Sequence, residues 1–271
     1  MNIPEKKGIL LAAFGPGTHE GRRVLELFGM EVERRFPGVP VRWALTSPRV
    51  RSRLAREREK TDSPRAALET MLCEGFSHIA VQSLHAIPGG EWDDLRAEIR
   101  RARVTGPAAR VETGAPLLAS EEDIAAAACA LVRHLPEDRQ ADEPCVFMGH
   151  GARHAGENAY ARLAEQTAAA DPGVHIAVMR GSRTLDHILP ALARMMPTPR
   201  RVWLLPFLAL AGGHALRDMA GSRPDSWKSR IEARGLSCTP VLKGLVEYSG
   251  FAALWLAHLD EAWARLIDGV H

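Results

Sequence analysis

Three histidines occupy positions at which they could share one chemical task. His85, His150 and His214 each directly follow a short apolar run of the kind that forms a buried β-strand. A neutral imidazole binds divalent first-row metals and accepts a proton near pH 7, so imidazoles at converging strand ends suit metal binding and proton transfer. The alternative is that each histidine caps its own loop through a hydrogen bond to the backbone.

Glycines accompany these histidines. Gly149 and Gly151 flank His150, and glycines at such positions let the backbone and a ligand approach each other closely. A glycine pair, Gly212-Gly213, precedes the third histidine in the same way. The first glycine turn of the chain, Gly15–Thr18, lacks the GxGxxG spacing of a dinucleotide site, so we do not expect a dinucleotide cofactor.

The elements that would position these residues follow a repeating pattern. Short apolar runs alternate with longer stretches of helical periodicity, which is typical of successive βα units with mostly parallel strands. Eight runs are predicted to be strands: Gly8–Phe14, Val41–Leu45, His78–Leu84, Arg110–Thr113, Cys145–Met148, His175–Met179, Arg201–Leu210 and Thr239–Leu242. Phe251–Ile267 is predicted to close the chain as an amphipathic helix.

A polar segment near the middle of the chain, Leu135–Pro144, is predicted to link two halves. The strand–helix pattern restarts after it, so we expect lobes at residues 1–138 and 139–271. In each half the first predicted strand ends in a glycine-bearing turn and the third ends near a histidine. The predicted fold is therefore α/β, with two similar lobes, each a mostly parallel four-stranded sheet flanked by helices, and a ligand cleft between them.

The composition excludes several classes of protein. The 271 residues are 46% hydrophobic, which is enough to fill a core, and their net charge of +2 argues against a nucleic-acid partner. The longest apolar run, Trp203–Ala211, is about half of a membrane span, so no membrane partner is expected. The four cysteines form no CxxC pair and are typical of buried thiols in a reducing compartment, which predicts a cytoplasmic protein.

Four motifs, taken in order along the chain, resemble one known family. They are Val81-Gln82-Ser83-Leu84-His85, Val146-Phe147-Met148-Gly149-His150-Gly151, Ala211-Gly212-Gly213-His214 with Asp218-Met219-Ala220, and Asp225-Ser226-Trp227-Lys228. They are similar to those of the anaerobic sirohydrochlorin cobaltochelatases, class II chelatases alongside ferrochelatase. The resemblance extends from Gly8 to about Leu259. It implies two similar α/β lobes with a tetrapyrrole between them.

The resemblance also implies an activity: insertion of Co²⁺, in some members Fe²⁺, into sirohydrochlorin on the cobalamin or sirohaem route, without ATP. It assigns His150 and His214 as the metal-binding and catalytic pair. A neutral histidine can accept a pyrrole proton, and histidine ligands leave coordination positions open for pyrrole nitrogens. The residues expected to bind the substrate are Gly15, His85, Glu91 and Arg180. No cofactor is expected beyond the substrate metal.

Arg180 departs from the family's pattern. The family places a glutamate there as a third metal ligand, and no Asp or Glu occurs between His175 and Arg183. A cation pointing inward would repel a divalent metal. Either Arg180 binds a substrate carboxylate, with the metal held by two histidines and water or another group such as Glu91, or metal insertion is altered. The first loop departs as well, since Phe14–Thr18 replaces a shorter Gly-Thr-Ser type of turn.

The sequence leaves two functions open. One is an enzyme, a sirohydrochlorin cobaltochelatase, and the other is a non-catalytic protein on the same fold that binds a tetrapyrrole, haem or metal. Arg180 is the residue that separates them. The sequence also leaves open which metal is used, among Co²⁺, Fe²⁺ and Ni²⁺, and whether the chain forms a homo-oligomer.

Overall fold

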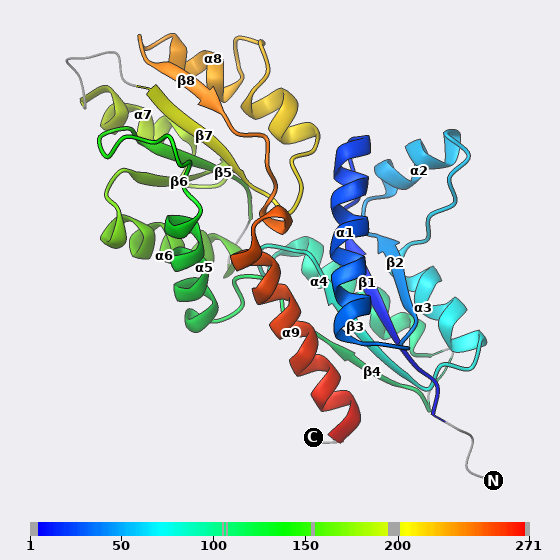
Figure 1. The fold of residues 1–271 in the computed structure, drawn as a ribbon. Helices are drawn as coiled ribbons and strands as arrows, with labels where there is room; N and C mark the ends of the chain where they lie inside the picture. The colour runs from blue at the N-terminus through cyan, green and yellow to red at the C-terminus, as the bar shows by residue number, and fades with distance from the viewer. Residues whose placement is uncertain (1–4, 105, 107, 153–154, 195–200, 269–271) are drawn as a thin grey trace. The chain divides into compact units, whose positions relative to one another are not determined.

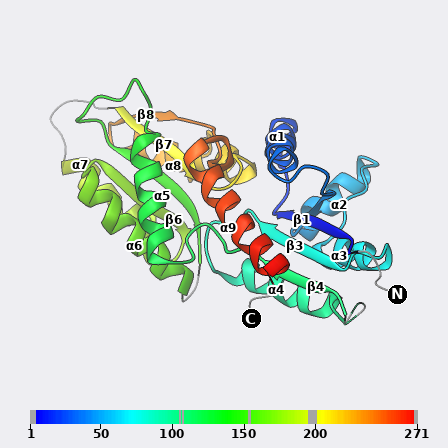
Figure 2. The same cartoon turned by 60° about the horizontal axis from the view of Figure 1, so that its bottom comes forward.

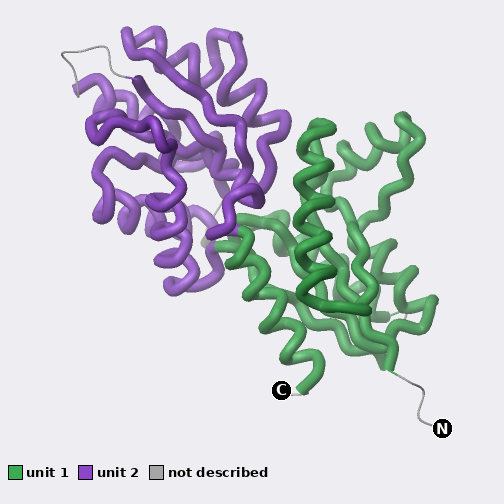
Figure 3. Tube along the Cα trace, viewed as in Figure 1, with its two compact units in different colours: residues 1–117, 252–271 green, residues 118–251 purple. Residues whose placement is uncertain are grey.

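Two parallel four-stranded sheets, each flanked by helices, make up the computed structural model (Figure 1). It describes residues 5–104, 106, 108–152, 155–194 and 201–268. The chain divides into two compact units, the first formed by Met1–Leu117 with Ala252–His271 and the second by Leu118–Phe251 (Figure 3). The predicted α/β class with two similar sheets is confirmed.

The first unit is built on a sheet with the strand order β2-β1-β3-β4. Its strands are β1 (Lys7–Ala13), β2 (Val41–Leu45), β3 (His78–Ser83) and β4 (Arg110–Thr113). Its helices are α1 (His19–Arg35), α2 (Pro48–Arg56), α3 (Pro64–Cys73), α4 (Gly90–Ala102) and most of α9 (Ser249–Asp268). The apolar run of β1 is buried on both faces, as expected for a central parallel strand.

The second unit repeats this arrangement with the order β6-β5-β7-β8. Its strands are β5 (Cys145–Gly151), β6 (Val174–Arg180), β7 (Arg201–Phe207) and β8 (Ser237–Pro240). Its helical elements are α5 (Glu121–Arg133), α6 (Ala155–Ala170), α7 (Leu185–Arg194), the π-helix η1 (His214–Met219), α8 (Trp227–Glu232) and the 3₁₀-helix η2 (Leu245–Glu247). Helices α5 and α6 lie side by side (Figure 2).

Both sheets place the third strand of the unit directly beside the first. In the first unit β1 pairs with β3, and in the second unit β5 pairs with β7, always in parallel. Within each unit, the residues that follow the first strand and those that follow the third strand therefore lie at neighbouring positions on the carboxyl edge of the sheet. The repeated pattern of strands and helices in the sequence thus corresponds to two sheets with the same strand order.

The two units differ from the predicted lobes, 1–138 and 139–271, in two places. Helix α5 belongs to the second unit, where Glu121 accepts a hydrogen bond from Arg162 Nη2 of α6 at 2.9 Å. Helix α9 belongs to the first unit from Ala252 onward, and the Trp255 indole nitrogen donates to the carbonyl oxygen of His85 at 3.3 Å. Contacts made far from the sequence midpoint thus decide the division.

The predicted strands are all present, with shifted ends. The predicted run Arg201–Leu210 ends as strand β7 at Phe207, and Thr239–Leu242 is replaced by β8 at Ser237–Pro240. Helix α2 was not predicted. It begins at Pro48 after Ser47, whose hydroxyl accepts from the amide of Val50 at 3.3 Å. Within the described ranges, no helix combines the length and apolar character needed to cross a membrane.

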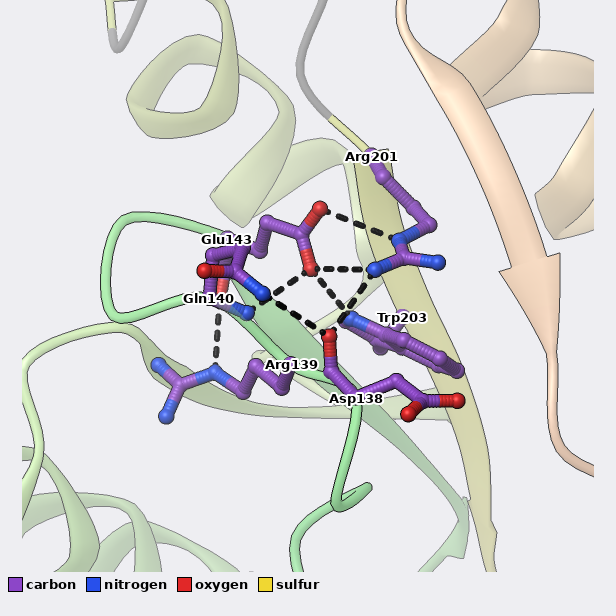
Figure 4. Close-up of polar contacts among 6 residues, drawn as sticks. All are labelled: Asp138, Arg139, Gln140, Glu143, Arg201 and Trp203. Atoms are coloured by element: carbon purple, nitrogen blue, oxygen red, sulfur yellow. Dashed lines mark hydrogen bonds and ion pairs between the residues drawn. The ribbon is translucent and has the colours of Figure 1, made fainter.

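The segment Leu135–Pro144 does not link the two units, because it joins α5 to β5 within the second unit. Its anchor is Glu143 (Figure 4). The carboxylate accepts hydrogen bonds from Arg201 Nε at 3.0 Å, from the indole nitrogen of Trp203 at 2.8 Å and from the amide of Gln140 at 3.1 Å. Burial opposes ionisation of Glu143, but these hydrogen bonds outweigh it and lower its pKa.

Glu143→Ala should destabilise the second unit by about 2 kcal/mol, because it removes several charge-assisted hydrogen bonds and leaves the Trp203 indole nitrogen unpaired. Folding lowers the pKa of Glu143, so its ionised carboxylate stabilises the native state. The part of the loss that depends on this charge should be present in full above pH 4.5, the ordinary pKa, and should disappear as the pH falls through the lower pKa of the folded protein. Urea unfolding at pH 7 and pH 4 measures both effects. Glu165→Ala, an exposed partner of Arg162 on α6, is the control and should change stability little.

Candidate functional site

The second unit brings His150 and His214 together. His150 lies in β5 and His214 is the first residue of η1, which follows β7. Because β5 and β7 are neighbouring parallel strands, their carboxyl ends place the two imidazoles with ring centroids 5.3 Å apart and ring planes at 53°. The predicted convergence of strand-end histidines is confirmed for this pair.

The glycines around His150 leave room for close packing of the strand. A Cβ atom on Gly149 would lie 2.5 Å from a ring carbon of Tyr160, a residue of α6. Gly151 has a φ of +91°, and a Cβ atom there would lie 1.9 Å from the carbonyl oxygen of Arg180. Larger residues would therefore push β5 away from α6 and β6. The Gly-His-Gly sequence fixes the position of the His150 backbone.

Arg180 is the last residue of β6 and pairs with Gly151 in the strand register, so it lies beside His150. Burial lowers the pKa of His150, and the neighbouring His214 and Arg180 lower it further. His150 is therefore neutral at pH 7, with a lone pair available for a metal or a proton. The turn after Arg180 is held from α6, where Glu157 accepts from the Ser182 amide at 2.7 Å.

His214 has an acidic neighbour that the sequence analysis did not single out. Its Nδ1 lies 2.6 Å from Oδ2 of Asp218, four residues further along η1. The signal available in the sequence was the His-x-x-x-Asp spacing, which puts both side chains on one face of a helical segment. The sequence motif Asp218-Met219-Ala220 included this residue but gave it no role of its own.

The Asp-Ser-Trp-Lys motif braces the loop that follows η1. The hydroxyl of Ser226 donates to the carbonyl oxygen of Gly221 at 2.6 Å and accepts from the amide of Ser229 at 3.1 Å, so that it also caps α8. Trp227 is buried in the core of the second unit. These contacts give the motif a structural role, which is to hold the segment that carries His214.

Gly15 lies in the first unit, in the loop that joins β1 to α1. It has a φ of +119°, and a Cβ atom would lie 2.7 Å from a methyl group of Val50 in α2. Arg53 of the same helix donates to the carbonyl oxygens of Pro16 and Gly17 at 2.6 and 3.1 Å. The unpredicted helix α2 thus sets the conformation of this loop.

His85 and Glu91 are also in the first unit, with Nε2 of His85 3.9 Å from Oε2 of Glu91. His85 is only 7% exposed, and neither ring nitrogen has a hydrogen-bond partner among the residues that the structure describes. Burial lowers its pKa to about 4. The hydroxyl of Ser83 in β3 is buried and, within the described ranges, has no hydrogen-bond partner either. Unpaired buried polar atoms are costly, so this cluster at the end of β3 is a candidate contact for a polar ligand.

Among the residues that the structure describes, no group of three or more His, Cys, Asp or Glu side chains is arranged to hold a metal ion. The residues predicted to form the site are divided between the two units. His150, His214 and Arg180 are together in the second unit, and Gly15, His85 and Glu91 belong to the first unit.

Comparison with known sequences points to one family. A family model described as cobalt chelatase (CbiK) matches residues 7–264. The chain is 53% identical over 263 residues to the sirohydrochlorin cobaltochelatase CbiKC of Nitratidesulfovibrio vulgaris, covering 97% of this chain and 93% of that protein. It is 33% identical over 266 residues to the sirohydrochlorin cobaltochelatase of Salmonella typhimurium, covering 97% and 98%.

Comparison with solved structures supports the fold. SirB from Bacillus subtilis with Fe³⁺ superimposes with a TM-score of 0.66 at 16% identity, covering 96% of both chains. The sirohydrochlorin chelatase SirB from Bacillus subtilis subspecies spizizenii, in complex with cobalt, gives a TM-score of 0.64 at 14% identity, covering 97% of both chains. At these identities the likeness concerns the fold alone.

His85 should make the protein acid-sensitive. Its pKa is about 4 in the folded chain and near 6.5 when unfolded, so below pH 6.5 the unfolded state takes up a proton that the native state does not. The free energy of unfolding should fall by about 3 kcal/mol between pH 7 and pH 4 from this residue alone. His85→Gln should remove that part of the pH dependence in urea unfolding, and an NMR titration showing that His85 protonates near pH 6.5 would contradict it.

Proposed function

Because the chain belongs to the cobalt chelatase family, we propose that it inserts Co²⁺ into sirohydrochlorin without ATP and that His150 and His214 bind the metal substrate. The observation that carries the assignment of the site is the pair of imidazoles 5.3 Å apart at the carboxyl ends of β5 and β7. The 53% identity to a sirohydrochlorin cobaltochelatase over nearly the whole chain supports the reaction.

Insertion of a metal into a tetrapyrrole requires the loss of two pyrrole protons and the delivery of a partly desolvated ion. Two histidine ligands hold a divalent ion and leave other coordination positions for pyrrole nitrogens. His150 is neutral at pH 7 because its burial lowers its pKa, so its lone pair is free to bind the ion or accept a proton. His150 and His214 are thus suited to both parts of the reaction.

Arg180 is proposed to bind a carboxylate of the substrate. In the described part of the chain no hydrogen bond or ion pair engages its guanidinium. Arg180 is the last residue of β6, and its charge acts on His150 of the neighbouring strand. Sirohydrochlorin carries many carboxylates, and arginine binds them in a bidentate geometry. Gly15, His85 and Glu91 remain proposed substrate-binding residues of the first unit. A cytoplasmic location also remains a proposal, supported by four cysteines without a disulfide.

The experiment that tests the function is a steady-state assay of Co²⁺ insertion into sirohydrochlorin, followed by the change in the tetrapyrrole absorption spectrum. We expect turnover well above the uncatalysed rate, in the absence of ATP. If the protein binds the tetrapyrrole tightly but does not raise the rate of insertion, the proposed catalytic function is wrong and the chain is a binding protein on the chelatase fold.

His150→Ala and His214→Ala should each reduce insertion to the uncatalysed rate, a loss on the order of 100-fold or more, because each removes a metal ligand and a proton acceptor. The assay measures kcat and the KM for Co²⁺. His187→Ala, an exposed histidine of α7, is the matched control and should behave as wild type. Wild-type rates in either site variant would refute the proposed metal site.

Arg180→Glu should raise the affinity for Co²⁺ and weaken the binding of sirohydrochlorin, each by about tenfold, because it replaces a cation beside His150 with a carboxylate. Equilibrium dialysis measures the first effect and tetrapyrrole titration the second. Arg194→Glu makes the same charge change on α7 and should alter neither. Unchanged sirohydrochlorin binding would show that Arg180 does not contact the substrate.

A further inference from the structure

We propose that Asp218 is a positioning residue for His214, which it holds in the tautomer and orientation that present Nε2 to the metal. The inference rests on the proposed metal site at His150 and His214. It adds a residue that acts through a ligand and does not itself bind the ion.

The hydrogen bond determines which nitrogen of His214 carries a proton. An ionised carboxylate only accepts hydrogen bonds, so the 2.6 Å contact between Oδ2 of Asp218 and Nδ1 of His214 requires the hydrogen to lie on Nδ1. In a neutral imidazole the other nitrogen, Nε2, then carries the lone pair. The contact thus selects Nε2 as the ligand atom.

The contact is built into a rigid segment. In η1 the amide of Ala220 donates to the carbonyl oxygen of Ala215, an i to i+5 bond of 3.0 Å that defines a π-helical turn. Ala215 and Met219 are fully buried and fix this turn in the core of the second unit, while His214 and Asp218 are both half-exposed on its outer side. Such π-helical turns are rare and are frequently found at functional sites.

His214 also differs from the other histidines that lie near a carboxylate. Within the described ranges, the histidine–carboxylate pairs His78–Glu5 and His85–Glu91 have their closest atoms 3.9 Å apart, beyond hydrogen-bond distance. The contact of His214 is 1.3 Å shorter than these. A carboxylate that accepts from a ligating histidine raises the basicity of that ligand and fixes its ring, and its loss typically lowers metal affinity 10- to 100-fold.

The test is a Co²⁺ titration of the full chain without tetrapyrrole, which gives a Kd and the ligand-field spectrum of the bound ion. Asp218→Ala should raise the Kd for Co²⁺ about 10- to 100-fold and change the spectrum. Asp218→Asn keeps the shape and an acceptor for Nδ1–H, so it should raise the Kd by less. In the insertion assay both variants should raise the KM for Co²⁺ and leave the KM for sirohydrochlorin unchanged.

Two further variants make the outcome decisive. Asp186→Asn removes a surface carboxylate paired with Arg230 on another part of the second unit and should leave the Kd unchanged. His214→Ala defines the loss expected when the ligand itself is removed. If His214→Ala binds Co²⁺ as wild type does, the proposed metal site is wrong. If His214→Ala loses binding while Asp218→Ala and Asp218→Asn keep the wild-type Kd and spectrum, the role of Asp218 alone is overturned.

Thermal unfolding separates a local effect from a loss of fold. If the unfolding midpoint of a variant stays near that of wild type, the change in its Kd for Co²⁺ reports a local effect on the metal site. If Asp218→Ala does not fold, Asp218→Leu, which has a similar length and removes both acceptor oxygens, carries the test. A wild-type Kd and spectrum in that variant overturn the proposal.

Discussion

The parallel pairing of β5 with β7 is the interaction on which the site depends. It places the carboxyl ends of two strands side by side, and so brings together two imidazoles that are 64 positions apart, from 150 to 214. β5 can lie this close to its neighbours only because Gly149 faces the Tyr160 ring and Gly151 adopts a positive φ against Arg180. The close packing of β5 against its neighbours therefore also fixes the distance between the two histidines.

Electrostatics complete what the strand pairing begins. Burial keeps His150 neutral, and Arg180 at the adjoining strand end adds to the effect. The same cation opposes a bound divalent metal but attracts carboxylates. In the proposed site, the two histidines would bind the metal ion and the arginine would bind an acidic organic substrate, which are the two reactants of a chelatase.

The two units share one strand order but hold their sheet edges differently. In the first unit Arg53 of α2 binds the carbonyl oxygens of the loop after β1. In the second unit the braces are Ser226 behind η1 and the Glu143 cluster, which ties the segment before β5 to Arg201 and Trp203 of β7. Each brace fixes an irregular segment with side-chain hydrogen bonds to groups that would otherwise be unpaired.

The sequence by itself determined the eight strands, the two-fold repeat and the residues that follow the strands, because apolar runs and glycine turns are local signals. The positions after such runs singled out His85, His150 and His214, and the resemblance to the chelatases then assigned His150 and His214 to the metal. The sequence did not determine that α5 and α9 cross the expected boundary, that Leu135–Pro144 is anchored by Glu143, or that Asp218 contacts His214. The first two depend on side chains that meet across the fold, and the free energy that selects them comes from packing between distant segments. The His-x-x-x-Asp spacing allows the contact of Asp218 with His214, but only the tertiary structure decided that the turn forms, because it buries Ala215 and Met219 of η1 in the core of the second unit.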